Sequence, residues 1–289
     1  MSRTGILIAC LLSTLLLARP AEPAAEGGAE PAAEGGAEPA AEGGADELLR
    51  RTLDALGGAG ALSEIRSIVS TADIEMPGLG VKGTMASRRM MPCLYRIDIR
   101  LGFFEISQGC DGDGMWRIDS NGMLVHLQDP ASAAERVTIC LIESYRYLLS
   151  DEGYTAAVAG SDTVGGSSCT VLEIVPEGGI PCRLSIDDAT GLPVRLSMTT
   201  KNGPVSETYG DYRPVGGIMF PHFTRIRQAA ADQTIVARTL SIEVNEPVDP
   251  LLFLPPPGSA DDYSFTGGGG SAMVPFTTHD RHIYIPVRL

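Results

Sequence analysis

The chain has 289 residues, 44% of them hydrophobic and 20% charged, which is enough apolar material to bury one sizeable core and a second small one. A formal net charge of −14, without a cluster of lysine and arginine side chains or an RNA-binding aromatic pattern, argues against nucleic acid as a partner. An acidic surface of this kind mainly favours solubility.

Residues 1–20 are typical of a signal peptide. Arg3 precedes the apolar run GILIACLLSTLLLA, which has the length of a signal-peptide core and is too short for a comfortable membrane span. We therefore expect the mature protein outside the cytoplasm. Cys10 lies in the sequence LIAC, which matches the pattern of bacterial lipoprotein signals, but the apolar run continues beyond it. Cleavage, lipidation and retention as an anchor close to the membrane all remain open.

Residues 21–45 form an acidic linker. The octad AEPAAEGG occurs three times without error between Ala21 and Gly44, and each copy carries two glutamates, one proline and a pair of glycines. Such a segment buries too little apolar surface to offset the chain entropy lost on folding, so we expect a solvated spacer. The repeat is also far too short for a solenoid unit.

A helix is predicted directly after this linker, within ADELLRRTLDALGG. Asp46 suits the N-cap position, and the Gly57–Gly58 pair is a stop signal. The leucines at helical spacing are Leu48, Leu49, Leu53 and Leu56. Beyond this helix the helical period disappears, and about two hundred residues are typical of strands separated by turn dipeptides. The predicted fold class is therefore α+β, mainly antiparallel β.

The best-specified hairpin lies within CLYRIDIRLGFFEISQGC. A two-residue turn at Leu101–Gly102 would place Ile99 opposite Phe104 and Ile97 opposite Ile106. The alternation of apolar and polar residues on both sides of this turn is typical of strands with one buried face.

The cysteine content allows a disulfide and leaves an odd thiol. In the same register Cys93 meets Cys110 at a non-hydrogen-bonded position, where Cβ atoms approach most closely, so a cross-strand disulfide is geometrically possible. A one-residue error in the turn would remove it. If Cys10 is set aside, the cysteines of the exported chain are Cys93, Cys110, Cys140, Cys169 and Cys182. Because their number is odd, at least one should be free or pair between chains.

Neither a metal site nor a catalytic residue is predicted. The chain has no Cys-x-x-Cys, and His279 and His282, its only two closely spaced histidines, belong to a predicted strand. The segment CDGDGMW lacks the later glutamate of an EF-hand loop, so hairpin turns explain its Asp-Gly pairs. Nucleophile-elbow, zinc-protease and phosphate-loop motifs are missing, and no acidic pair has a spacing that suggests acid–base work. No cofactor is expected.

A second helix is predicted within residues 129–150, DPASAAERVTICLIESYRYLLS. Pro130 stands near its start, and the residues along one helical face are Val137, Leu141, Ser144, Tyr145 and Leu148. This helix either simply covers one face of a sheet or acts as a lid over an apolar concavity of the kind that a strongly curved sheet creates. Composition alone leaves both interpretations open.

The order of these elements resembles the LolA-like fold of bacterial periplasmic lipoprotein carriers over residues 46–257. After the N-terminal helix come STADIEM, PCLYRIDIR, CDGDGMWRID, the second helix, and then the segments DATGLPVR and DYRPVGGIMFPH. That fold is an unclosed antiparallel half-barrel, plugged by helices, with a greasy cavity that takes acyl chains. The resemblance implies a non-catalytic module that binds an apolar or acylated ligand in the bacterial periplasm or cell envelope.

One departure from the carriers concerns the latch of the lid. The resemblance implies a basic residue before the proline of the segment MPCLYR, where it would help hold the lid, but Met91 precedes Pro92 here, although Arg96 is retained. We therefore expect this chain to share the apolar cavity of the carriers but not their lipoprotein shuttle mechanism. The candidate lining residues, each of which core packing would explain as well, are Ile97, Ile99, Phe104, Ile106, Trp116, Val137, Leu141, Tyr145 and Leu148.

The C-terminal segment resembles a different family. A Gly-rich linker at 258–272 leads into MVPFTTHDRHIYIPVRL, residues 273–289, which is similar to the opening of bacterial retropepsin-like aspartyl proteases. In those enzymes the next strand delivers Asp-Thr/Ser-Gly, whose carboxylate activates water with a second aspartate. The chain contains no such tripeptide, so no catalytic aspartate is assigned. The alternative function is therefore the accessory N-terminal part of an exported aspartyl protease, truncated and inactive, in which Ile283, Ile285 and Val287 would lack their usual partners.

Overall fold

The computed structural model describes residues 44–102, 104–119, 122–256, 277–279 and 282–284, and the chain divides into two units between Pro255 and Pro256. The predicted signal peptide, nearly all of the acidic linker and the Gly-rich linker lie outside the described residues. Within the described part, no helix is both long and apolar enough to cross a membrane.

The larger unit is built on one antiparallel sheet of thirteen strands, in the order β6-β5-β4-β3-β2-β1-β13-β12-β11-β10-β9-β8-β7. The edge strands β6 and β7 do not pair with each other, so the sheet is not closed into a barrel. This confirms the predicted class, mainly antiparallel β with an unclosed sheet. The strands are β1 (Ser67–Met76), β2 (Val81–Met90), β3 (Leu94–Leu101), β4 (Phe104–Cys110), β5 (Met115–Ile118), β6 (Leu124–Leu127), β7 (Tyr154–Val164), β8 (Ser167–Pro176), β9 (Cys182–Asp187), β10 (Pro193–Thr200), β11 (Gly203–Val215), β12 (Ile218–Gln228) and β13 (Gln233–Val244).

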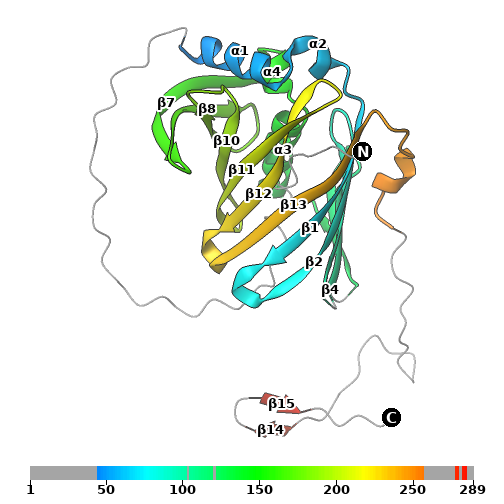
Figure 1. Ribbon diagram of the computed structural model, residues 1–289. Coiled ribbons are helices and arrows are strands. Elements are labelled where there is room, and N and C mark those ends of the chain that lie inside the picture. The colour runs from blue at the N-terminus through cyan, green and yellow to red at the C-terminus, as the bar shows by residue number, and fades with distance from the viewer. Residues whose placement is uncertain (1–43, 103, 120–121, 257–276, 280–281, 285–289) are drawn as a thin grey trace. The chain divides into compact units, whose positions relative to one another are not determined.

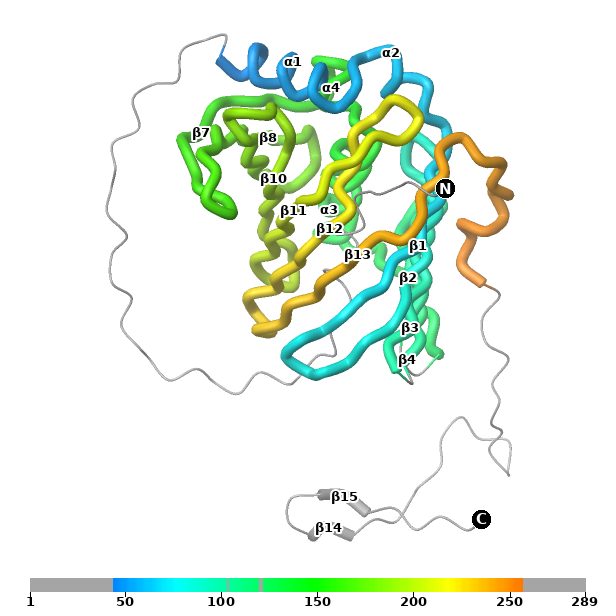
Figure 2. The backbone as a smooth tube through the Cα atoms, in the orientation of Figure 1, coloured from blue at the N-terminus to red at the C-terminus, as the bar shows by residue number. Residues whose placement is uncertain are grey.

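Four α-helices accompany this sheet: α1 (Gly44–Leu56), α2 (Gly58–Ser63), α3 (Pro130–Glu143) and α4 (Arg146–Leu149). Helix α3 lies within the curve of the sheet, because it contacts both β5 and β8, which belong to opposite halves of the strand order (Figure 1). Helices α1 and α2 run across one end of the half-barrel, where α1 contacts β7 and β12 (Figure 2). Together α3 and α4 connect the two edge strands of the sheet.

Both predicted helices are present, with breaks that have local causes. The first begins at Gly44 and ends at Leu56, because Gly57 takes a φ of +128° that L side chains rarely adopt. The second is interrupted at Tyr145, whose φ of +57° separates α3 from α4. A positive φ at a large aromatic residue is unusual and indicates that the surrounding packing imposes it.

The predicted hairpin is present, but its register is shifted by two residues along β4. Leu101 pairs with Phe104 and Ile99 pairs with Ile106, so the turn begins at Gly102 instead of Leu101. Gly102 has a φ of +59°, which suits the first turn position of a type I′ hairpin. Because a shift of two preserves the alternation of faces, every side chain of β4 keeps the face that was predicted for it.

The smaller unit contains a two-stranded antiparallel sheet, in which β14 (Thr277–His279) pairs with β15 (His282–Tyr284). A strand was expected in this segment, and both strands belong to a sheet of their own. Ile283, Ile285 and Val287 were predicted to lack their usual packing partners. Ile285, Val287 and the side chain of Ile283 lie outside the described residues.

Candidate functional site

The candidate site is the concave face of the thirteen-stranded sheet, called the inner face below, together with the helices that cover it. Strand residues of this face that are no more than 2% exposed include Ile97, Ile99, Leu172, Leu184, Ile186 and Leu196. They form one continuous apolar cluster with side chains of α3, α4 and the residue between them: Ile139, Leu141, Ile142, Tyr145 and Leu148. The helices therefore cover a surface that would otherwise expose apolar area to water.

The predicted lining residues do not all occupy this cluster. Five of them are buried within it: Ile97, Ile99, Leu141, Tyr145 and Leu148. Phe104 and Ile106 share the face of Ile99 and Leu101 on the neighbouring strand but are only half-buried, and Val137 of α3 is also half-buried. These three residues lie toward the margin of the site.

Trp116 is a correction, because it lies on the opposite, convex face of the sheet. It pairs with Gly109, whereas its neighbour Met115 pairs with Cys110 of the inner face. The Trp116 indole N–H donates to the carbonyl of Phe253 over 2.8 Å, and the guanidinium of Arg96 stands 5.6 Å from the ring centroid. A segment after β13, η4 (Pro250–Phe253), thus buries this tryptophan from outside.

A buried ion pair fastens α3 to the sheet. Arg89, on the inner face of β2, pairs with Glu143 at the end of α3, and the two side chains are only 6% and 8% exposed. The sequence placed the missing basic latch at Met91, two residues further on. Arg96, which the resemblance retained, instead lies on the convex face and binds Asp98. A basic side chain therefore contacts the helix from a different position than expected.

The N-terminal half of α3 is held by further polar contacts. Asp129 caps the helix by accepting from the Ser132 N–H at 3.0 Å, and it pairs with the ammonium of Lys201 at 2.8 Å. Hydrogen bonds from Lys201 and Ser132 lower the pKa of Asp129. The buried Glu135 carboxylate accepts from the Lys201 backbone N–H at 2.5 Å, while burial raises its pKa. Thr138, fully buried, donates to a loop carbonyl at 2.8 Å.

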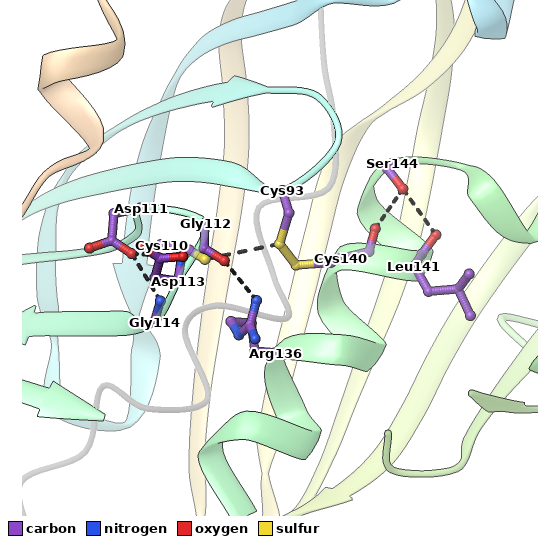
Figure 3. The surroundings of a disulfide bond; sticks show 10 residues. All are labelled: Cys93, Cys110, Asp111, Gly112, Asp113, Gly114, Arg136, Cys140, Leu141 and Ser144. Atoms are coloured by element: carbon purple, nitrogen blue, oxygen red, sulfur yellow. Dashed lines mark hydrogen bonds between the residues drawn. A yellow bond between two sulfur atoms is a disulfide. The ribbon is translucent and has the colours of Figure 1, made fainter. Parts of the chain in front are cut away.

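A disulfide joins α3 to the turn between β2 and β3, and it corrects the predicted pairing. Cys93 is bonded to Cys140, with 5.1 Å between their Cα atoms, and not to Cys110. The observed register places Cys110 opposite Tyr95, and its sulfur lies 3.9 Å from the Cys93 sulfur (Figure 3). Among the described residues, Cys110, Cys169 and Cys182 are free and buried, which confirms that at least one thiol is unpaired.

Four tyrosines meet beneath the break between α3 and α4. Tyr145, Tyr147, Tyr209 and Tyr212 line a small cavity of about 10 Å³. The hydroxyl of Tyr145 is buried and has no hydrogen-bond partner within the described part of the chain. Burial raises the pKa of Tyr145 and also that of Tyr212, so both hydroxyls stay protonated at neutral pH. The cavity thus offers a hydrogen-bond donor in apolar surroundings.

Sequence reasoning missed Arg89, Glu143 and three of the tyrosines. A signal existed for the ion pair, because Met85, Ser87 and Arg89 alternate along one strand and place a charge on its buried face. No comparable signal marks the tyrosines, because one pair lies at α4 and the other on β11, and the two pairs meet only in the folded chain. In the described ranges, no group of three or more histidine, cysteine or acidic side chains could hold a metal ion.

No protein-family model matches the chain, and no curated protein matches it. Among solved structures, it is similar to a DUF1329 family protein from Desulfovibrio piger, at 12% identity and a TM-score of 0.47, with 73% of this chain and 97% of that chain covered. It is also similar to a LolA superfamily protein from Nitrosomonas europaea, at 10% identity and a TM-score of 0.47, with 73% and 98% covered. The fold described above rests on the sheet topology of the chain itself.

Proposed function

We propose that this chain is an exported, non-catalytic module that binds an apolar or acylated ligand between the inner face and helices α3 and α4. The observation that carries the proposal is the continuous apolar cluster shared by an unclosed sheet and two short helices. Because the helices contact the sheet through side chains, they can move away without breaking the backbone hydrogen bonds of the sheet.

The described structure corresponds to a closed state of such a site. The cavity among the tyrosines has about 10 Å³, and another beside Arg89 and Cys140 has about 20 Å³, so neither holds more than a water molecule. A ligand that enters between the inner face and these helices must therefore displace α3 or α4. Burying an acyl chain contributes about 0.8 kcal/mol per methylene, so a chain of about twelve carbons contributes about 10 kcal/mol against the contacts that the helices lose.

Tyr145 would recognise the polar end of the ligand. Its hydroxyl is a buried donor without a partner among the described residues, and a buried polar group in this condition costs about 1–3 kcal/mol. A carbonyl, ester or carboxylate oxygen of a lipid would satisfy it. The ligand class is therefore an apolar chain that carries a hydrogen-bond acceptor.

The test is a titration of the purified full chain with a fluorescent fatty acid, followed by competition with unlabelled fatty acid. We expect saturable binding that is lost in Tyr145→Glu and weakened by about 5–10-fold in Tyr145→Phe. The same Tyr145→Phe chain should unfold at higher denaturant than the wild type, since it no longer buries an unsatisfied hydroxyl.

Tyr154→Phe is the matched control, because that hydroxyl donates to the Tyr147 carbonyl at 2.7 Å instead of to the cavity. It should lose stability and keep its affinity for the fatty acid. An absence of saturable binding to the wild-type chain would refute the proposed function.

A further inference from the structure

We propose that Cys93, Cys110 and Cys140 form a thiol–disulfide exchange site, in which the bond of Cys93 passes from Cys140 to Cys110. The three sulfurs come from three different elements: the β2–β3 turn, the end of β4 and helix α3. This inference concerns the covalent state of the chain and does not depend on ligand binding.

The geometry makes Cys93 the central sulfur. It is bonded to Cys140, and the Cys110 thiol, fully buried, lies 3.9 Å from it as a weak hydrogen-bond donor (Figure 3). A thiol within contact distance of a disulfide sulfur can attack it without a large movement of the chain. Cys169 and Cys182, the other free cysteines in the described ranges, lie on β8 and β9.

The exchange balances without any further reactant. Cys110 loses its proton to solvent, and its thiolate attacks the Cys93 sulfur to form the Cys93–Cys110 bond. The Cys93–Cys140 bond breaks in the same step, and Cys140 leaves as a thiolate that takes up a proton. One disulfide and one thiol are present before and after, so nothing is oxidised or reduced overall.

The surroundings of Cys110 set how readily this happens. Burial and, to a smaller extent, the Asp111 carboxylate raise the pKa of its thiol, while a hydrogen bond from the Gly112 backbone and the nearby Arg136 side chain oppose that rise. Arg136, on α3, also donates to the Gly112 carbonyl at 3.0 Å. The thiolate is thus a minor species that is stabilised by a cation of the same helix that the disulfide holds.

The exchange would change what the disulfide fastens. Cys93–Cys140 joins the β2–β3 turn to α3, whereas Cys93–Cys110 would join that turn to β4. After the exchange α3 would be held by noncovalent contacts such as the Arg89–Glu143 pair. The three cysteines would therefore control whether α3 is covalently attached to the rest of the larger unit.

Disulfide mapping tests this directly, because trypsin places each of the three cysteines on its own peptide: 90–96, 101–117 and 137–146. The native oxidised full chain is incubated at mildly alkaline pH, quenched in acidic denaturant, labelled with a maleimide and digested without reduction. We expect the link of 90–96 to 137–146 to be replaced in part by a link to 101–117, with an equal gain of label on 137–146.

Two variants identify the attacking thiol. Cys110→Ser should keep the original link at all times and leave 137–146 unlabelled, while Cys182→Ser should exchange as the wild type does. The proposal is overturned if the wild-type chain holds only the link to 137–146 at every time point, or if 90–96 becomes joined to 147–183, which carries Cys169 and Cys182. Both outcomes are independent of whether a fatty acid binds.

Discussion

Arg89 and Glu143 are the residues whose pairing should matter most for the closed position of α3. Both are almost fully buried, so removing one partner leaves a desolvated charge. Arg89→Met should lower the free energy of unfolding by about 3–5 kcal/mol, and the double change Arg89→Met with Glu143→Leu should recover most of it. Urea unfolding monitored by circular dichroism measures both.

The exposed pair of Arg100 and Glu105 is the control for that experiment. Its side chains are 75% and 72% exposed, and a pair of this kind contributes under about 1 kcal/mol. If Arg100→Met costs as much as Arg89→Met, burial is not the reason for the effect.

Two carboxylates of the α3 region, Glu135 and Asp129, should change the free energy of unfolding in opposite directions as the pH rises. Burial raises the pKa of Glu135, so the folded chain keeps a proton that the unfolded chain loses, and stability falls as pH rises between the unfolded and folded values. Lys201 and Ser132 lower the pKa of Asp129, so its contribution is present above the unfolded value and is lost as pH falls toward the folded one.

The corresponding variants should therefore diverge. Glu135→Gln should become more stable relative to the wild type as pH rises from about 4 to 7, whereas the cost of Asp129→Asn should shrink below about pH 4. Urea unfolding at several pH values measures both trends. Parallel profiles for the two variants would show that the environments of these carboxylates are not as described.

At the scale of elements, the disulfide is the strongest tie between α3 and the sheet. It joins residues that are 47 positions apart in the sequence, and a disulfide that closes a loop of this size stabilises a fold by about 2–4 kcal/mol. Cys93→Ser removes the sulfur that the Cys93–Cys140 and Cys93–Cys110 bonds share, and it should lower the free energy of unfolding by that amount. A reducing agent should destabilise the wild type and Cys169→Ser, and should leave Cys93→Ser unchanged.

The junction of α1 and α2 depends on a backbone that only glycine adopts easily. A Cβ at Gly57 would lie 2.3 Å from the Gly217 carbonyl oxygen, in a residue with a φ of +128°. Gly57→Ala should therefore lower stability by more than about 1 kcal/mol, which thermal unfolding would reveal. Gly60→Ala, inside α2 with no atom within 4 Å of the added Cβ, should be neutral or stabilising by up to about 1 kcal/mol.

The elements also show which parts of the fold the sequence could predict. Alternation along β3 identified its buried residues, and the leucine spacing identified α1, because both signals are local. The hairpin register was not recoverable, since it depended on whether Gly102 occupies the first or the second turn position. The disulfide was missed for a related reason: Cys140 reaches Cys93 only because α3 lies inside the curve of the sheet.

The larger unit as a whole is an open sheet whose concave face is covered by helices and not by further strands. The buried residues of α3 and α4 replace the far side of a barrel, so the core is complete only when these helices are in place. Leu251, Leu252 and Leu254 near the end of the larger unit expose apolar side chains outside that core. They are a second surface on which a fatty acid could bind nonspecifically.

Photo-crosslinking with a diazirine fatty acid distinguishes these two surfaces and shows whether the fatty acid binds at the inner face. The full chain is irradiated with the probe, with and without excess unlabelled fatty acid, and its tryptic peptides are analysed by mass spectrometry. We expect competed labelling on 137–146, which carries Leu141 and Tyr145 of the inner-face cluster. Competed labelling confined to 239–281, the peptide of the exposed leucines, would contradict this expectation.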